Sequence, residues 1–145
     1  MSNKFNESFA REMKRIAYDI PKEKLMLLVD KIIEGLRYLK RKILREQAAS
    51  FSFSRKDLAE RIDAAIITLR TAKPIIALET VKSKIADAFA KVMVVVYKAL
   101  YKASPKVAKQ FYKLVRTAGI FIVVQEPTNM EETAKMVEMQ PFFMN

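Results

Sequence analysis

The stretch from Lys22 to Ser50, KEKLMLLVDKIIEGLRYLKRKILREQAAS, decides the fold class of this 145-residue chain. Large apolar residues recur in it three or four positions apart, which is the spacing of one face of an α-helix. These positions are Leu25, Leu28, Val29, Ile32, Leu36, Leu39 and Ile43. The outer face begins acidic and ends basic, the order that the helix dipole favours. We therefore expect one long helix from Lys22 to about Ser50, with a buried stripe close to a heptad repeat.

Helical spacing also precedes this stretch. Apolar residues from Phe9 to Ile20 recur at helical intervals, and Asn6 is placed to cap the first turn. Pro21 either ends this first helix or opens the next one at its first position. The whole chain has only two glycines and five prolines, so we expect long elements joined by short connections.

Two further helices are expected after a break at residues 50–53. Ser54 and Asp57 form a capping box that starts the third helix. Its expected buried face consists of Leu58, Ile62, Ala65, Ile66 and Leu69. Residues 72–74, Ala-Lys-Pro, interrupt the pattern, and a fourth helix is expected from Pro74 onward. Its core stripe is Leu78, Val81, Ile85, Phe89, Val92, Val96 and Leu100.

A fifth helix is expected to begin with Ser104 as its cap and Pro105 at its first position, and to end at Gly119. Its core positions are Val107, Phe111, Leu114 and Ala118. For the apolar run at 120–124, a strand, a buried extended segment and a helical extension all remain open. Residues 128–131 form a second capping box before a short helix that ends near Met139.

Together these elements predict an all-α fold. We expect a helical bundle of about four main helices, with short accessory helices and an extended apolar C-terminal tail. The chain divides into a basic helical bundle at 1–125 and, at 126–145, a short acidic helix with the apolar tail. No secretory signal is visible and no apolar stretch is long enough to span a membrane, so we expect a soluble, cytoplasmic protein.

The composition disfavours an enzyme, a metal site and a cofactor. The chain has neither Cys nor His, which removes thiol chemistry and the commonest general base and metal ligand. Asp57, Glu60 and Asp63 share a helical face that could hold a hard cation, but interleaved basic residues favour an exposed ion-pair face. No glycine-rich phosphate loop or nucleophile elbow is present. We expect no catalytic residue, no metal and no cofactor.

The net charge of +11 predicts attraction to polyanions, with simple solubility as the alternative. The segment from Lys82 to Arg116 holds nine basic residues and one acid. The candidate residues for binding a partner or polyanion, which could together form a continuous cationic surface, are Arg37, Arg41, Arg45, Lys84, Lys91, Lys98, Lys102, Lys106, Lys109, Lys113 and Arg116. Because lysine dominates the segment, nucleic acid would be bound through phosphates, independently of sequence and with strong salt dependence.

The same segment allows two other interpretations. Tyr97, Tyr101 and Tyr112 could stack on bases, although aromatic residues at helical spacing more often pack in or beside the core. The basic helices could lie on an anionic membrane, but their apolar stripe is needed to form the bundle. A membrane role is therefore the least favoured interpretation.

The C-terminal segment differs from the rest. Residues 117–145 carry four Glu and one Lys, and they end in Pro-Phe-Phe-Met-Asn. Met139, Phe142, Phe143 and Met144 could enter a pocket on a partner. The alternative, which we weight slightly more, is that this tail folds back over its own bundle.

The lack of Cys and His, with few Asn and Gln, also leans towards a hot habitat. Together with its length, the Lys-rich helices and the apolar tail, this composition resembles small proteins of viruses that infect hyperthermophilic archaea. More narrowly, the chain is similar to the helical coat-protein-like group, which includes an inhibitor of the host RNA polymerase. The resemblance rests on general features, so no residue is carried over from it.

The resemblance implies a non-catalytic viral protein that lodges in the DNA channel of the host polymerase and blocks transcription. Such a channel is itself positive, so the protein would present its acidic region to it or place its lysines on acidic rims. That acidic region comprises Glu126, Glu131, Glu132 and Glu138. Two hypotheses thus remain: a protein that binds RNA polymerase, and a structural DNA-binding protein that coats or packages a genome.

If the tail binds a partner, deleting Pro141–Asn145 should abolish binding and leave the melting temperature nearly unchanged. Pull-down and thermal unfolding followed by circular dichroism measure the two effects. A large fall in melting temperature would instead show that the tail packs on its own bundle.

Overall fold

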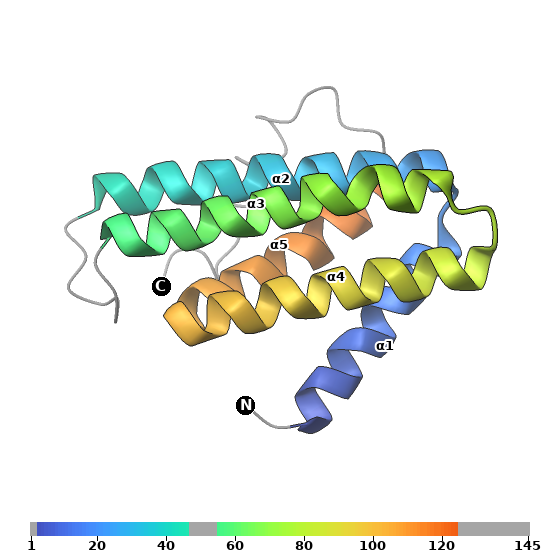
Figure 1. The fold of residues 1–145 in the computed structure, drawn as a ribbon, viewed down its shortest axis with the longest axis horizontal. Helices are drawn as coiled ribbons and strands as arrows, with labels where there is room; N and C mark the ends of the chain where they lie inside the picture. Colours follow the sequence, from blue (N-terminus) through green and yellow to red (C-terminus); the bar gives the residue numbers. More distant parts are fainter. Residues whose placement is uncertain (1–2, 47–54, 125–145) are drawn as a thin grey trace.

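The computed structural model describes residues 3–46 and 55–124, which form five α-helices without a strand. The helices are α1 (Asn3–Asp19), α2 (Lys22–Arg45), α3 (Arg55–Leu78), α4 (Lys82–Ala103) and α5 (Pro105–Val124). Helices α2 to α5 form a closed cycle, since each packs on the next and α5 returns to α2. Helix α1 packs on α4 and runs oblique to the cycle (Figure 1). The predicted all-α bundle of four main helices is confirmed.

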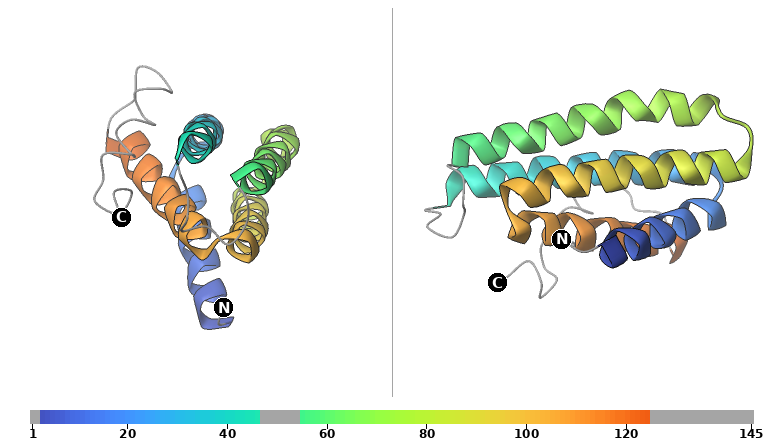
Figure 2. Two further views of the ribbon diagram at one scale, coloured as in Figure 1. Left: turned by 90° about the vertical axis from the view of Figure 1, so that its left-hand side faces the viewer. Right: turned by 60° about the horizontal axis from the view of Figure 1, so that its bottom comes forward.

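The order of the cycle fixes which helices are opposite each other. Within the cycle, each helix runs antiparallel to the next, as short connections require. Because α2 and α4 are not neighbours in the cycle, they lie diagonally across the bundle from each other (Figure 2). Helix α1 lies on the outside of this cycle, on the side of α4 and α5. The charged outer faces of α2 and α4 therefore point to different sides of the molecule.

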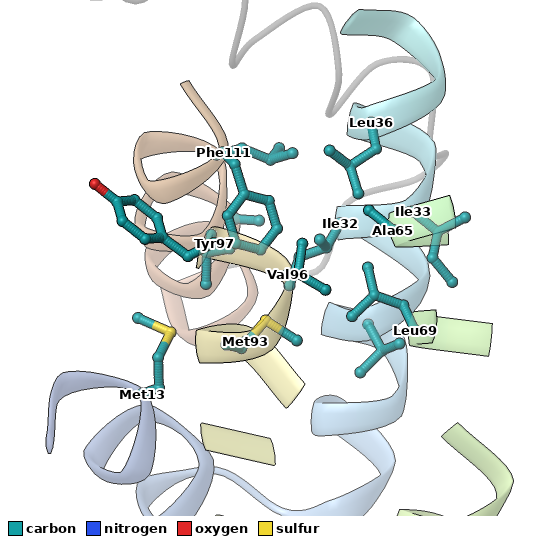
Figure 3. Packing of buried hydrophobic residues seen from close by; sticks show 14 of the residues in the cluster. Met13, Ile32, Ile33, Leu36, Ala65, Leu69, Met93, Val96, Tyr97 and Phe111 are labelled. Carbon is teal, nitrogen blue, oxygen red and sulfur yellow. The ribbon is translucent and has the colours of Figure 1, made fainter. Parts of the chain in front are cut away.

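The core is continuous through all five helices. In Figure 3, Leu36 and Ile32 of α2 approach Val96 and Met93 of α4, and Phe111 of α5 lies beside them. Every predicted core position of α2 is buried, and so are the predicted core residues of α5 up to Ala118. The periodicity was a sound guide here because each of these helices buries one face and exposes a charged face.

Helices α2 and α5 approach closely at Gly35. A Cβ atom added there would lie 2.5 Å from Cδ1 of Leu114 and 3.1 Å from its Cγ. Both residues are buried, so Leu114 occupies the space that any side chain at position 35 would need. This glycine sets the distance between the two helices.

Basic side chains bind the C-terminal ends of three helices. Lys22 Nζ donates to the carbonyl oxygens of Ala77 and Glu79, both at 2.8 Å, at the end of α3. Lys82 Nζ donates to the carbonyl of Ile20 at 2.6 Å, just beyond α1. Arg55, the first residue of α3, donates to the carbonyl of Glu46 after α2. Each donor thus comes from a different helix than the one it caps.

The predicted break at residues 72–74 is wrong, because α3 continues through Pro74 to Leu78. A proline inside a helix removes one hydrogen bond and costs roughly 3 kcal/mol. Contacts with α2 compensate: Lys73 Nζ lies 2.6 Å from Oδ1 of Asp30, and Ile76 is buried. As a result, Leu78 and Val81, predicted to be core residues, are exposed instead.

The end of α5 and the start of α1 also differ from prediction. Gly119 does not stop α5, which continues to Val124 because Ile122 is buried in the core; the apolar run is thus a helical extension. Asn6 lies inside α1 and is not its cap, since an extra turn brings Phe5 against Phe9 and Tyr97.

The described helix α2 ends at Arg45, short of Ser50, because Glu46 is extended. Ser104 does cap α5 as predicted: its Oγ accepts from the N–H of Val107 at 3.2 Å, and Pro105 is the first helical residue. The capping boxes at 54–57 and 128–131 and the tail residues Met139, Phe142, Phe143 and Met144 fall wholly or partly outside the described residues.

Replacing Gly35 with Ala should destabilise the protein by about 1–3 kcal/mol through overpacking, despite the better helix propensity of alanine. Urea unfolding followed by circular dichroism measures the free energy of unfolding. The double variant with Leu114→Ala should lose less free energy of unfolding than the sum of the two single losses, because the new methyl group fills space that the leucine side chain has vacated.

Gly119→Ala is the matched control. Its added Cβ would meet Ile16 at an ordinary 3.7 Å, so this change should stabilise the protein by roughly 0.5–1 kcal/mol. An equal effect of the two glycine substitutions would contradict the close approach of α2 and α5.

Candidate partner and polyanion interface

Four lysines lie along one exposed face of α4. Lys84, Lys91, Lys98 and Lys102 are seven, seven and four positions apart, so they project in nearly the same direction. The opposite face of the helix buries Phe89, Met93 and Leu100. Among residues 3–46 and 55–124, none of the four lysines pairs with an acid. We call this row the α4 lysine stripe.

The basic residues of α5 lie on its outer face, opposite buried Phe111. Lys109 and Arg116 are exposed, whereas Lys106 and Lys113 are half-buried. Arg116 is held in place because its Nε lies 3.1 Å from Oε1 of Glu12 in α1. Helices α4 and α5, which carry these cations, border the side of the bundle on which α1 lies (Figure 2).

The basic cluster of α2 lies elsewhere. Arg37 pairs with Glu34 at 3.2 Å, and the guanidinium of Arg41 lies 5.7 Å from the ring centre of Tyr38. Because α2 is diagonal to α4, exposed Arg41 and Arg45 face away from the α4 lysine stripe. The eleven predicted cations therefore form at least two separate surfaces within the described residues.

The three tyrosines of the basic segment belong to an aromatic cluster. The ring centroid of Tyr97 lies 5.1 Å from those of both Phe5 and Phe9, and the rings of Phe9 and Tyr112 are 5.6 Å apart. Tyr101 adjoins Tyr97 at 6.0 Å. Only 3% of Tyr97 is exposed, so this ring cannot stack on a base. The core interpretation of these residues is the one that the geometry supports.

Glu12 joins α1 to α5 through this cluster. Its Oε2 accepts a hydrogen bond of 2.8 Å from the hydroxyl of Tyr112, while its other oxygen faces Arg116. The guanidinium of Arg116 lies 5.6 Å from the centre of the Tyr112 ring. Such charge-assisted contacts are stronger than neutral ones and fix the relative positions of the three side chains.

Two tyrosines have a perturbed pKa. Burial raises the pKa of Tyr97, and the neighbouring phenols of Tyr101 and Tyr112 act in the same direction. Burial also raises the pKa of Tyr112, and the hydrogen bond to the Glu12 carboxylate adds to this effect against the opposing charge of Arg116. Both phenols therefore keep their protons to a higher pH than a free tyrosine.

Helix α3 carries an exposed apolar row, which sequence analysis missed. Leu78, Ile75 and Ile67 are 84%, 65% and 63% exposed and lie on one helical face with exposed Ala64 and Thr71. We call these five residues the α3 apolar stripe. Large apolar side chains gathered in one row on a protein surface typically mark an interaction site. The signal was hidden because Leu78 was expected to belong to the core of the next helix.

The three acids that share a face of α3 were the candidates for binding a hard cation. Of the three acids on one face of α3, Asp63 is engaged by Lys40 of α2, whose Nζ lies 2.9 Å from both carboxylate oxygens. No group of three or more potential ligands is close enough to hold a metal ion in the part of the chain that is described. Over those same residues, no helix has the length and hydropathy needed to cross a membrane.

The charges of α1 were not singled out by sequence analysis either. Arg11, Lys14 and Arg15 are exposed on the face opposite Phe9 and Met13.

Comparison with known proteins adds no relative, since no family model, no curated protein and no solved structure matches the chain. Function must therefore be inferred from these surfaces themselves.

The shifted pKa values predict a pH effect. Since the folded state retains protons on Tyr97 and Tyr112 after the unfolded chain has lost them, stability should be fully present below pH 10 and fall as the pH rises through the folded pKa values. The double variant Tyr97→Phe/Tyr112→Phe should lose stability less steeply above pH 10, as measured by urea unfolding at several pH values.

Tyr18→Phe is the control, because it removes an exposed phenol that lies outside the cluster. Titration of phenol absorbance at 295 nm gives a direct check. Ionisation of all five tyrosines in one step near pH 10 would contradict the burial of the cluster.

Proposed function

We propose that this protein is a non-enzymatic regulator that binds RNA polymerase in its DNA channel and inhibits transcription. The observation that carries the proposal is the α3 apolar stripe. Contact with DNA phosphates needs cations and gains nothing from isoleucine and leucine side chains, whereas a protein partner can bury them. A protein surface is therefore the better match for this face.

The neighbouring helix supplies the complementary charge. Helices α3 and α4 pack together, so the apolar stripe and the α4 lysine stripe lie on adjacent elements. A partner surface with an apolar patch and an acidic rim would match both. Acidic rims on a nucleic-acid-handling machine also resolve the problem of placing a protein of charge +11 in a positive channel.

The choice of RNA polymerase comes from the resemblance to the coat-protein-like group of archaeal viruses. Features of the chain that agree with it are the helical bundle, the many cations and the missing Cys and His residues. If the source is viral, the protein would act in the cytoplasm of the host.

A structural DNA-binding protein that coats or packages a genome is the second candidate. It is favoured by the α4 lysine stripe, whose four ammonium groups point outward without acidic partners among the described residues. This function predicts binding to any duplex, with an affinity that falls steeply as salt rises.

Our primary proposal predicts a one-to-one complex with an archaeal RNA polymerase and inhibition of transcription in vitro. The triple variant Ile67→Gln/Ile75→Gln/Leu78→Gln should bind at least about tenfold more weakly, because burying these side chains supplies much of the affinity. Its melting temperature should hardly change, since all three are exposed in the free protein.

The control is Leu44→Gln/Ile120→Gln, which removes exposed apolar side chains from α2 and α5 and should retain binding. A parallel measurement with random duplex DNA across a salt series separates the two candidates. Tight, steeply salt-dependent DNA binding without affinity for the polymerase would overturn the primary proposal and support a packaging role.

A further inference from the structure

A polar hollow of about 510 Å³ lies between α1 and α5. Its lining consists of Ser8, Arg11, Glu12, Arg15, Tyr112 and Arg116. Three guanidinium groups and one carboxylate thus face the same space, which leaves two positive charges uncompensated there. The hollow is open to solvent, so a ligand there would be held by charge and hydrogen bonds and not by enclosure.

Helix α1 contributes two arginines to the hollow. Arg11 and Arg15 are one turn apart, and among the described residues neither pairs with an acid. Like charges at this spacing repel each other, and Arg116 adds a third positive charge from α5. An anion in the hollow would remove this repulsion.

The far wall of the hollow is already fixed. Glu12 holds Arg116 through its Nε and binds the hydroxyl of Tyr112, so these groups need little reorganisation when a ligand arrives. Preorganised guanidinium groups suit phosphate, because each can give two parallel hydrogen bonds to its oxygens. The net charge of the hollow matches a phosphate monoester, which carries close to two negative charges at neutral pH.

We propose that the hollow formed by Arg11, Arg15 and Arg116 is a binding site for a terminal phosphate group, carried either by a free nucleotide or by the 5′ end of a nucleic acid strand. This site differs from the diffuse contacts that the lysines of α4 could make along a phosphate backbone. It is independent of the polymerase proposal, because the isolated protein should bind the phosphate.

The test is a titration of the full-length protein with AMP and with adenosine at about 0.1 M salt, where exposed charges more than about 10 Å apart are largely screened. NMR signals of the arginine Nε–H groups report which guanidinium responds. AMP should bind saturably and shift the Arg11, Arg15 and Arg116 signals, whereas adenosine should not. Equal effects of both compounds, or a shift that never saturates, would overturn the proposal.

Variants that remove the same number of positive charges distinguish a local binding site from the general electrostatic attraction of a basic protein. Arg11→Gln/Arg15→Gln should weaken AMP binding at least about tenfold, the loss of one or two charge-assisted hydrogen bonds. Lys98→Gln/Lys102→Gln removes the same charge outside the hollow and should change affinity less than about twofold. Arg11→Lys/Arg15→Lys keeps the charge, yet it should also lose affinity because lysine lacks the planar fork. Equal losses in the first two variants would refute a local site.

Oligonucleotides with and without a 5′-phosphate then distinguish the two sources. At least about tenfold tighter binding of the phosphorylated strand would assign the site to strand ends, and both forms binding alike while AMP saturates would assign it to free nucleotides. Because the three arginines are exposed or half-exposed, unchanged circular dichroism should confirm that all variants fold.

Discussion

The last carbonyl groups of an α-helix have no partner inside the helix, and in this chain basic side chains from other helices bind them. A glycine with positive φ commonly performs this task, but no described residue has that conformation and both glycines lie within helices. Lys22, Lys82 and Arg55 take over the role. Since each comes from a different helix, closing a helix end also fixes how two helices lie relative to each other. The helical cycle depends on these contacts as well as on its core.

The positive charges that give the chain its net charge of +11 have two different roles. Part of the charge holds the fold together, as in the caps and in the pairs that Lys40 and Lys73 make between α2 and α3. Other cations make no such contact within residues 3–46 and 55–124, above all the α4 lysine stripe and the arginines of α1. The unpaired groups are concentrated on the side formed by α1, α4 and α5, so that side is where electrostatic recognition of a partner is most favourable.

The fold class and most buried positions followed from periodicity, because a helix with one buried face and one exposed, charged face has an unambiguous apolar stripe, as in α2. Periodicity failed at Pro74, where local chemistry predicts a break but the Lys73–Asp30 contact and the burial of Ile76 keep the helix intact. Because the helix boundary was predicted in the wrong place, Leu78 was predicted to lie in the core, whereas it is exposed. The candidate site was less predictable still. The sequence does not distinguish a lysine that caps a helix from an unpaired one. It also does not reveal that Arg11 lies near Arg116, because the two are about a hundred residues apart.

Helix α1 has its partners at the far end of the chain. Glu12 and Tyr112 are separated by 100 residues, and the rings that cover Phe5 and Phe9 come from α4 and α5. During synthesis on a ribosome, α1 is therefore made long before the surface on which it packs. Its amphipathic face, with Phe9 and Met13, stays exposed to chaperones or to other nascent chains until α5 has emerged. The risk of aggregation is therefore highest during synthesis, before α4 and α5 cover the apolar face of α1.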